Sequence, residues 1–328
     1  MDLFGDVARQ YADFAAYARE DSPCLADWAT AAAADPDVMA WVSQLPPLKQ
    51  QPNLVFAAAR WHGVPAPGPY AALRAALLGD DGDIARTVLT RSTQTNEVGR
   101  LATLMPVLAG IARESARPLA LLEVGASAGL CLYPERYDYA WPPVGGLTGS
   151  GGPLLTCEVT GRPDLPAAVP QVAWRGGIDL HPLDVTDADA MAWLAVLVWP
   201  EQDERRARLA AAIEVARSDP PVLVRGNLLT ELPAAVETAA RHGQVVVFHS
   251  AVIAYLEPAD RARFVEMMTG LVAGGTRWVS NEAKNVLPQV TATGPDVPAD
   301  LPTFVLGVDG HAVAWTHGHG RTMTWLPE

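Results

Sequence analysis

Beyond about residue 115 the sequence alternates short apolar runs with helical stretches, and this alternation constrains the fold more than any other feature. Five runs have the length and composition of buried strands: Leu119–Val124, Val172–Leu180, Pro221–Asn227, Gln244–Ser250 and Arg277–Glu282. A helical stretch precedes each of the last three, and the clearest one runs from Pro200 to Arg217. Strands that alternate with helices predict a mostly parallel sheet covered on both faces.

The chain before residue 115 has the pattern of helices. Apolar side chains recur every three or four positions from Leu3 to Ala18, as on one face of a helix. Further helical segments are Asp37–Gln44, Asn53–His62, Tyr70–Leu78, Ile84–Leu89 and about Glu97–Arg113. We expect no strand in this part. The sequence therefore predicts a helical domain over residues 1–115 and an α/β domain over residues 116–328.

Two parts of the second domain depart from the alternation. Residues 133–170 are rich in Gly and Pro, which predicts a loop or antiparallel hairpin inserted between the first helix and the second strand. Such insertions often shape a substrate pocket. In the C-terminal tail, strand-like runs joined by DG and GHG predict an antiparallel hairpin.

Composition excludes several classes of function. The net charge of −13, from 24 Lys and Arg against 37 Asp and Glu, would repel a nucleic-acid backbone. The three cysteines are scattered and no metal-ligand spacing occurs, so we expect no disulfide framework and no metal, and a cytoplasmic location fits. The N-terminal residues carry acids, unlike a secretory leader, and no apolar run approaches the roughly 20 residues of a membrane span. We expect a soluble protein that acts on a small molecule, and its oligomeric state is not predicted.

The stretch LLEVGASAGL follows the first predicted strand and fits two chemistries. Gly125, Ser127 and Gly129 match the G-x-S-x-G nucleophile elbow of serine hydrolases. They also match the glycine-rich turn that lets a nucleotide approach the backbone after a first strand. An elbow normally follows several strands, whereas this stretch follows helices, so its position favours the nucleotide turn. Two alternatives stay open: a triad of Ser127 with groups such as Asp309 and His317, and a small-residue turn needed only for packing.

A nucleotide turn is expected to have an acid at the end of the second strand, where it accepts hydrogen bonds from ribose hydroxyls. Asp179, in the run GIDLHPLDV, occupies that place. It lies farther from Gly125 than the usual spacing of about 20 residues, and the inserted segment accounts for the difference. The alternative for Asp179 is a turn acid or a helix cap.

These runs together resemble a known fold. LLEVGASAGL, GIDLHPLDV, LVRGNLLTEL and VVVFHSAVIAYLEPADRARF, in that order, resemble the class I S-adenosylmethionine-dependent methyltransferases. That resemblance implies a Rossmann-like sheet, mostly parallel with an antiparallel C-terminal hairpin, after the helical N-terminal domain. More closely, TQTNE, LLEVGASAGLCLYPERYDY, LVWPEQ and SNE resemble the bacterial domain-of-unknown-function family twenty-three thirty-two, whose members are methyltransferase-like. The resemblance covers most of the chain and bears on fold more than on activity.

The resemblance implies S-adenosylmethionine as the cofactor. The loop around its methionine end would be formed by Glu123, Gly125, Ala126, Ser127 and Gly129. Asp179 would hold the ribose. Asn227 and Leu228 stand where such enzymes place an acid and its neighbour beside the adenine, and an Asn oxygen could accept the adenine amine without adding charge.

Catalytic candidates follow the fourth and fifth predicted strands, because open α/β sheets bind ligands at the carboxyl ends of their strands. His249 is the predicted general base, since an imidazole can take up a proton near neutral pH. Tyr255 and Glu282 are further catalytic candidates, and Asn281 could orient the acceptor. Each has a structural alternative: a strand-end hydrogen bond for His249, a partly buried ring for Tyr255, and loop capping for Asn281 and Glu282.

The segment TQTNEVGR places several hydrogen-bonding side chains just before a helix. Asn96 or Thr95 could cap that helix, with Glu97 in its first turn. Gln94 and Asn96 exceed what capping needs, which predicts a lid or brace over the methionine end or the substrate. Arg100 could pair with a carboxylate there.

The leading hypothesis is methyl transfer from S-adenosylmethionine to an unidentified small molecule. Nucleobase amino-methylases commonly carry an Asn/Asp-Pro-Pro-aromatic stretch after the fourth strand. This chain has HSAV there, which disfavours a nucleobase as the substrate. Two other classes remain open. One is a non-catalytic sensor or scaffold that retains the fold, and the other is a serine hydrolase that uses Ser127.

Overall fold

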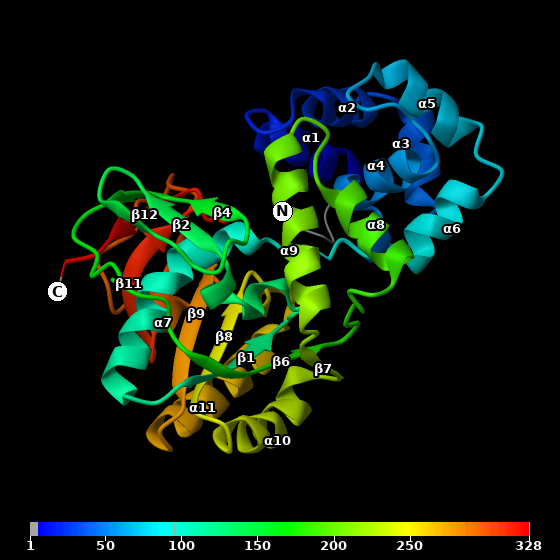
Figure 1. The fold of residues 1–328 in the computed structure, drawn as a ribbon. Helices are drawn as coiled ribbons and strands as arrows, with labels where there is room; N and C mark the ends of the chain where they lie inside the picture. Colours follow the sequence, from blue (N-terminus) through cyan, green and yellow to red (C-terminus); the bar gives the residue numbers. More distant parts are fainter. Residues whose placement is uncertain (1–5, 95, 328) are drawn as a thin grey trace. The chain divides into compact units, whose positions relative to one another are not determined.

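The computed structural model describes residues 6–94 and 96–327, and the chain divides into two units (Figure 1). The helical unit takes in Met1–Thr95 and Ala188–Ala210, and the sheet unit takes in Asn96–Asp187 and Ala211–Glu328. This division differs from the predicted boundary near residue 115, because the last helix before the first strand belongs to the sheet unit. Leu3, where the predicted N-terminal apolar pattern begins, lies outside the described residues.

The helical unit contains α1 (Val7–Ala18), α2 (Pro23–Ala33), α3 (Pro36–Ser43), the 3-10 turn η1 (Pro47–Lys49), α4 (Pro52–Trp61), α5 (Tyr70–Leu78), α6 (Asp83–Thr90) and α8 (Ala188–Leu197). A further helix, α9 (Asp203–Ser218), begins in this unit and ends in the sheet unit. Helix starts follow from local sequence: the side chains of Asp6, Ser22 and Asp35 accept hydrogen bonds from first-turn amides. As predicted, the described residues before 115 contain no strand.

The two chain segments of the helical unit share one core. The ring of Phe14 packs edge-on against Trp199, with centroids 5.7 Å apart. The Arg60 guanidinium donates hydrogen bonds to the carbonyls of Val196 and Val198, at 2.8 and 3.0 Å. Because α8 ends at this point, Arg60 satisfies carbonyls that the helix itself leaves without donors. Ala188–Ala210 is therefore an integral part of the helical unit.

The sheet unit is built on a nine-stranded sheet in the order β5-β12-β11-β10-β9-β8-β1-β6-β7. The strands are β1 (Leu119–Val124), β5 (Glu158–Thr160), β6 (Val172–Asp179), β7 (Val222–Arg225), β8 (Gln244–Ser250), β9 (Arg277–Ala283), β10 (Phe304–Val308), β11 (His311–Thr316) and β12 (Thr322–Trp325). The strands from β9 to β7 pair in parallel, and β10 to β12 form the predicted antiparallel tail. The chain leaves β1 toward β6 on one side and later returns to β8 on the other. The sheet therefore has a topological switch point between β1 and β8.

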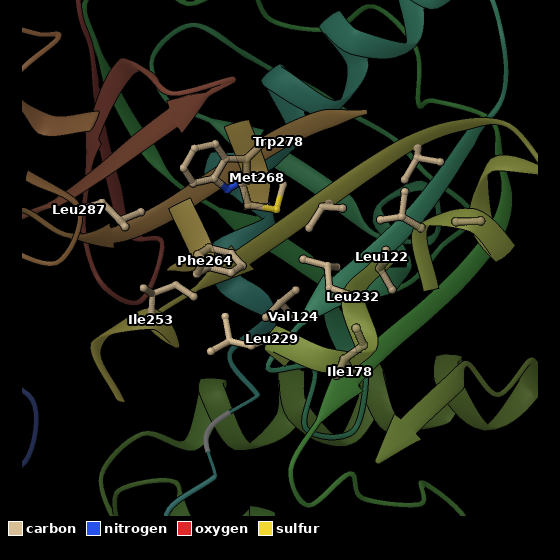
Figure 2. Close-up of a cluster of buried hydrophobic side chains, with 14 of the residues drawn as sticks. Leu122, Val124, Ile178, Leu229, Leu232, Ile253, Phe264, Met268, Trp278 and Leu287 are labelled. Atoms are coloured by element: carbon tan, nitrogen blue, oxygen red, sulfur yellow. The ribbon is translucent and has the colours of Figure 1, made fainter. Parts of the chain in front are cut away.

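The helices of the sheet unit are α7 (Leu101–Ser115), α10 (Leu228–Ala240), α11 (Pro258–Ala273) and α12 (Pro288–Thr291), with 3-10 turns η2 (Val98–Arg100), η3 (Leu130–Leu132), η4 (Pro134–Arg136) and η5 (Ile253–Tyr255). Figure 2 shows the core that α10 and α11 form against one face of the sheet, where Leu122 and Val124 meet Leu232 and Phe264. Side chains alternate between the two faces along a strand. Glu123 therefore projects from the face opposite to this core.

The insertion is only partly the predicted hairpin. Its strand β2 (Asp138–Trp141) pairs antiparallel with β3 (Gly145–Leu147) but parallel with β4 (Leu154–Thr156). After β4 the chain joins the main sheet as β5, which pairs in parallel with β12. The Trp141 indole N–H donates to the Ala102 carbonyl at 2.8 Å and so attaches the small sheet to α7.

The helix predicted directly after β1 is absent. Among the described residues from 125 to 137, the chain forms only the short turns η3 and η4. Gly129 adopts φ +71° and Pro134 opens η4, so the chain between them is too short for an α-helix. The stretch after β1 is therefore a bend that leads directly into the insertion.

Candidate functional site

The bend after β1 is closed by hydrogen bonds from the chain itself. The amides of Gly125 and Ala126 donate to the Ile178 carbonyl at 2.8 and 3.2 Å, and the Gly129 amide donates to the Ala126 carbonyl at 2.7 Å. Gly125 and Ser127 adopt φ of +71° and +52°, in the left-handed region. An anion-binding turn needs amides that point at the ligand. These amides already have acceptors, so the bend is not a phosphate cradle.

Asp179 lies directly beside the bend. Its Oδ2 accepts a hydrogen bond from the Ser127 amide and its Oδ1 accepts one from the His181 amide, both at 2.8 Å. The bend approaches strand β6 closely, which explains the glycine at position 177. A Cβ on Gly177 would lie 2.4 Å from the Cβ of Ala126. Each carboxylate oxygen keeps a second lone pair, so the half-buried Asp179 can also accept a hydroxyl donor.

Glu123 is buried beside Asp179 with one oxygen unsatisfied. The residue is 6% exposed, and its Oε2 has no hydrogen-bond partner among the described residues. Burial, followed by repulsion from Asp179, raises the pKa of Glu123 well above the ordinary carboxyl value, while Arg100 and Cys131 oppose this rise. The Ser127 hydroxyl is likewise buried without a partner. A ligand that offers hydrogen bonds would satisfy both groups.

We expect Glu123→Gln to change how stability depends on pH. A carboxyl with a raised pKa stabilises the fold fully below its unfolded pKa of about 4.3, and that contribution is lost as the pH rises through the folded pKa. The wild-type and variant midpoints of unfolding should therefore coincide near pH 4 and diverge above it, with the variant more stable, by about 1.4 kcal/mol for each pKa unit of the rise. Calorimetric unfolding at a series of pH values measures this. Glu257→Gln, at an exposed position, is the control, and parallel curves for wild type and Glu123→Gln would contradict the prediction.

The segment that starts at Asn96, before α7, hydrogen bonds to the chain just after the bend. The Asn96 Oδ1 accepts a hydrogen bond from the Leu130 amide at 2.9 Å, so Asn96 holds the chain after the bend and does not cap a helix. Glu97 caps η2 through a hydrogen bond from the Gly99 amide at 3.0 Å. The other predicted cap, Thr95, lies outside the described residues. This segment is therefore a brace that acts through the backbone of the bend.

Arg100 joins this brace to two other parts of the sheet unit. Its Nε donates to the Gly318 carbonyl at 2.8 Å, and a terminal nitrogen donates to the Ser250 carbonyl at 3.1 Å. The loop before β12 also approaches closely, because a Cβ on Gly320 would lie 2.2 Å from the Gly99 carbonyl oxygen. The sequence predicts a carboxylate partner for Arg100, whereas the sequence pattern gives no sign of these bonds to carbonyls. The glycines of GHG were the only signal of this close approach.

His249 and Glu282 lie on the other face of the sheet. His249 is 0% exposed, its Nδ1 hydrogen bonds to the Glu282 Oε1 at 2.7 Å, and its Nε2 accepts from the Trp278 indole N–H at 3.0 Å. The ring packs edge-on against Phe264, in the core shown in Figure 2. Both ring nitrogens are therefore engaged, and the sheet separates this pair from the Glu123 side chain.

The remaining predicted site residues are dispersed. Tyr255 is 72% exposed on η5. The buried Asn281 accepts a hydrogen bond from the Thr316 hydroxyl at 2.7 Å. The Asn227 Oδ1 caps α10 through the Leu229 amide at 2.9 Å. Asn281 therefore bonds to side chains of two other strands and does not cap a loop, whereas Asn227 has a capping role.

Two further predicted residues are Leu228 and Gln94. Leu228 opens α10 and packs half-buried against the core of Figure 2. Gln94 belongs to the helical unit, whereas Asn96, Glu97, Arg100 and Asn281 belong to the sheet unit.

The groups of the alternative hydrolase triad lie apart. Asp309 accepts hydrogen bonds at 2.6 Å from Arg277 and at 2.8 Å from the Trp278 amide, at the start of β9, whereas the bend follows the end of the parallel strand β1. The His317 Nδ1 accepts from the His319 amide at 3.0 Å. The Ser127 hydroxyl has no partner among the described residues, so it has no base beside it.

The sheet unit is thus an α/β protein with a polar, acid-lined bend at the switch point of a mostly parallel sheet. A model of the bacterial family DUF2332, described as "Uncharacterized protein conserved in bacteria", matches residues 8–325. The chain belongs to this family. No curated protein and no solved structure matches it. In the described part of the chain, none of the helices has the length and apolar character needed to cross a membrane.

Proposed function

We propose that the sheet unit binds S-adenosylmethionine at the bend after β1 and transfers its methyl group to a small molecule. The polarity of the bend carries this proposal. The Glu123 oxygen has no partner, Asp179 lies beside it, and the amides of Gly125 and Ala126 already have acceptors. Such a site favours a cation or a hydrogen-bond donor over a phosphate. S-adenosylmethionine offers an ammonium group, a sulfonium and ribose hydroxyls, and it has no phosphate.

The order of the strands supports the same placement. Read from β7 through β6, β1 and β8 to β9, the parallel strands follow the doubly wound order, with the bend at its switch point. Ligands of open α/β sheets bind outside the carboxyl ends of the strands at this point. The absence of a helix after β1 among the described residues removes the helix dipole that attracts phosphates, which again favours a ligand without phosphate there.

The roles of individual residues follow from their chemistry. Asp179 would accept hydrogen bonds from the ribose, and Glu123 with Ser127 would hold the methionine end. When bound, the cofactor supplies an electrophilic methyl group, so the protein contributes chiefly by positioning. A base is needed only for a protonated acceptor. Because both nitrogens of His249 are engaged, the exposed Tyr255 is the remaining candidate for that role.

Calorimetric titration with S-adenosylmethionine and with S-adenosylhomocysteine tests the proposal. We expect Asp179→Asn to weaken the binding of both about 10- to 100-fold, because hydrogen bonds to a charged group contribute roughly 1.5–3 kcal/mol. Asp184→Asn is the matched control, since Asp184 is an exposed acid on the next loop. Wild-type protein that takes up neither compound, or equal affinity in the two variants, would refute the proposal.

A second candidate is binding without turnover, as in a sensor. The internal hydrogen bonds of His249 favour it, because they engage both nitrogens of the predicted base. The two candidates differ in one measurement. A methyltransferase forms S-adenosylhomocysteine when small-molecule fractions are added to protein and cofactor, whereas a sensor binds the cofactor and forms none.

A further inference from the structure

The side chain of Val252 occupies the space directly above the bend. A Cβ built on Gly125 would lie 1.9 Å from the Cγ2 of Val252, so the valine is in contact with the glycine backbone. This is the space through which a ligand would approach the backbone of a glycine-rich turn. Whether the bend can receive a ligand therefore depends on where Val252 is held.

Several hydrogen bonds hold the turn that carries Val252, and three of them converge on one carboxylate oxygen. The amides of Val252 and Ile253 both donate to the Glu282 Oε1, at 3.0 and 3.1 Å, and His249 donates to the same atom. The other oxygen of Glu282 is buried without a partner among the described residues. The Ala251 amide also donates to the Asn281 carbonyl and Arg100 to the Ser250 carbonyl, both at 3.1 Å, so Glu282 holds the part of the turn at Val252 and Ile253.

The two ends of the turn differ in how firmly they are fixed. Ile253 is fully buried in the core, whereas Val252 is half-buried and Ala251 adopts φ +58°, which is unfavourable for a residue with a Cβ. A movement of Ala251 and Val252 with Ile253 held in place would relieve this backbone conformation. The geometry therefore has a fixed hinge, a strained residue and a side chain that covers the bend.

We propose that Ser250–Ile253 is a gate over the bend, with Val252 as its cover and Glu282 as its latch. Closed, the gate fills the approach to Gly125. Open, it uncovers the backbone of the bend at Gly125, two residues before the unpartnered Ser127 hydroxyl. That the ligand is S-adenosylmethionine rests on the proposed function, whereas the gate itself concerns access to the bend. His249 then serves the latch through its hydrogen bond to Glu282.

Access to the bend can be measured without a ligand. Ser127 is 4% exposed, so a Ser127→Cys protein should react slowly with a maleimide at that position, as followed by mass spectrometry of the labelled peptide. We expect the labelling rate to rise about tenfold or more when Val252→Ala or Glu282→Gln is added, because either change favours the open state. Val313→Ala, on β11, is the matched control and should leave the rate unchanged.

The outcomes are distinct. Faster labelling with Val252→Ala and an unchanged rate with Val313→Ala supports the gate, even if Glu282→Gln fails to fold. An unchanged rate with Val252→Ala, or an equal rise with Val313→Ala, overturns it. Titration with S-adenosylhomocysteine separates the two proposals. A gate without cofactor binding shows faster labelling and no heat of binding, whereas both proposals together predict tighter binding by the Val252→Ala variant.

Discussion

Replacing His249 by alanine should lower the free energy of unfolding of the sheet unit by about 3–5 kcal/mol. The substitution removes one of the three donors to the Glu282 Oε1 and leaves the Trp278 indole N–H without its acceptor inside a closed core. It also leaves a cavity beside Phe264, since the histidine is fully buried against that ring. Urea-induced unfolding followed by tryptophan fluorescence measures the change.

Tyr255→Ala serves as the comparison, because its exposed side chain should change the free energy of unfolding by no more than about 0.5 kcal/mol. The same pair of variants separates a structural from a catalytic histidine. If His249→Ala unfolds like wild type and loses only turnover, the ring acts as the base that the sequence predicted. A large loss of stability instead assigns it to the core of the sheet unit.

Gly125→Ala should destabilise the sheet unit by about 2–5 kcal/mol, as the sum of a backbone part and a packing part. About 1–2 kcal/mol comes from placing a Cβ in the left-handed region, where Gly125 has φ +71°. A further 1–3 kcal/mol, roughly, comes from overpacking, because the new methyl group would overlap Val252. The difference in unfolding free energy from wild type measures the sum.

A control and a double variant divide this sum into its parts. Gly275 has φ +94°, and a Cβ added there would have no neighbouring atom within 4 Å, so Gly275→Ala should show the backbone part alone. Adding Val252→Ala to Gly125→Ala should restore most of the overpacking part. Additive effects of the two substitutions would mean that Val252 and Gly125 are not in contact.

The sequence predicts the central strands well. Leu119–Val124 and Gln244–Ser250 coincide with β1 and β8, because strands buried on both faces are continuous apolar runs that end at turn residues. The helix predicted over Pro200–Arg217 starts three residues later, at Asp203. Ends of this kind are less certain, since the cap geometry decides them and composition does not.

Other features of the fold depend on contacts that a local pattern does not contain. The predicted helix after β1 is missing from the described residues, because Gly129 turns the chain into the insertion. The boundary near residue 115 is displaced, because α7 packs on β9 and β10 of the sheet unit. Periodicity identifies α7 as a helix, but it does not say against which unit the helix packs.

The sequence predicts the residues of the candidate site that follow from their place along a strand, but not those that depend on tertiary contacts. Asp179 follows from its position at the end of the second long strand, and its hydrogen bond to the Ser127 amide places it at the bend. The contacts of Arg100 with the carbonyls of Gly318 and Ser250 leave no trace in side-chain spacing, since any residue has a carbonyl. The position of Val252 above Gly125 is a tertiary contact of the same kind.

The helical unit is not contained in the N-terminal part of the chain alone. It requires Ala188–Ala210, which lies in the sequence between the strands β6 and β7. A gene truncated after residue 115 would encode Phe14 without Trp199 and Arg60 without its carbonyl acceptors. Exchange of the N-terminal part alone would therefore separate those residues from the segment that completes their core.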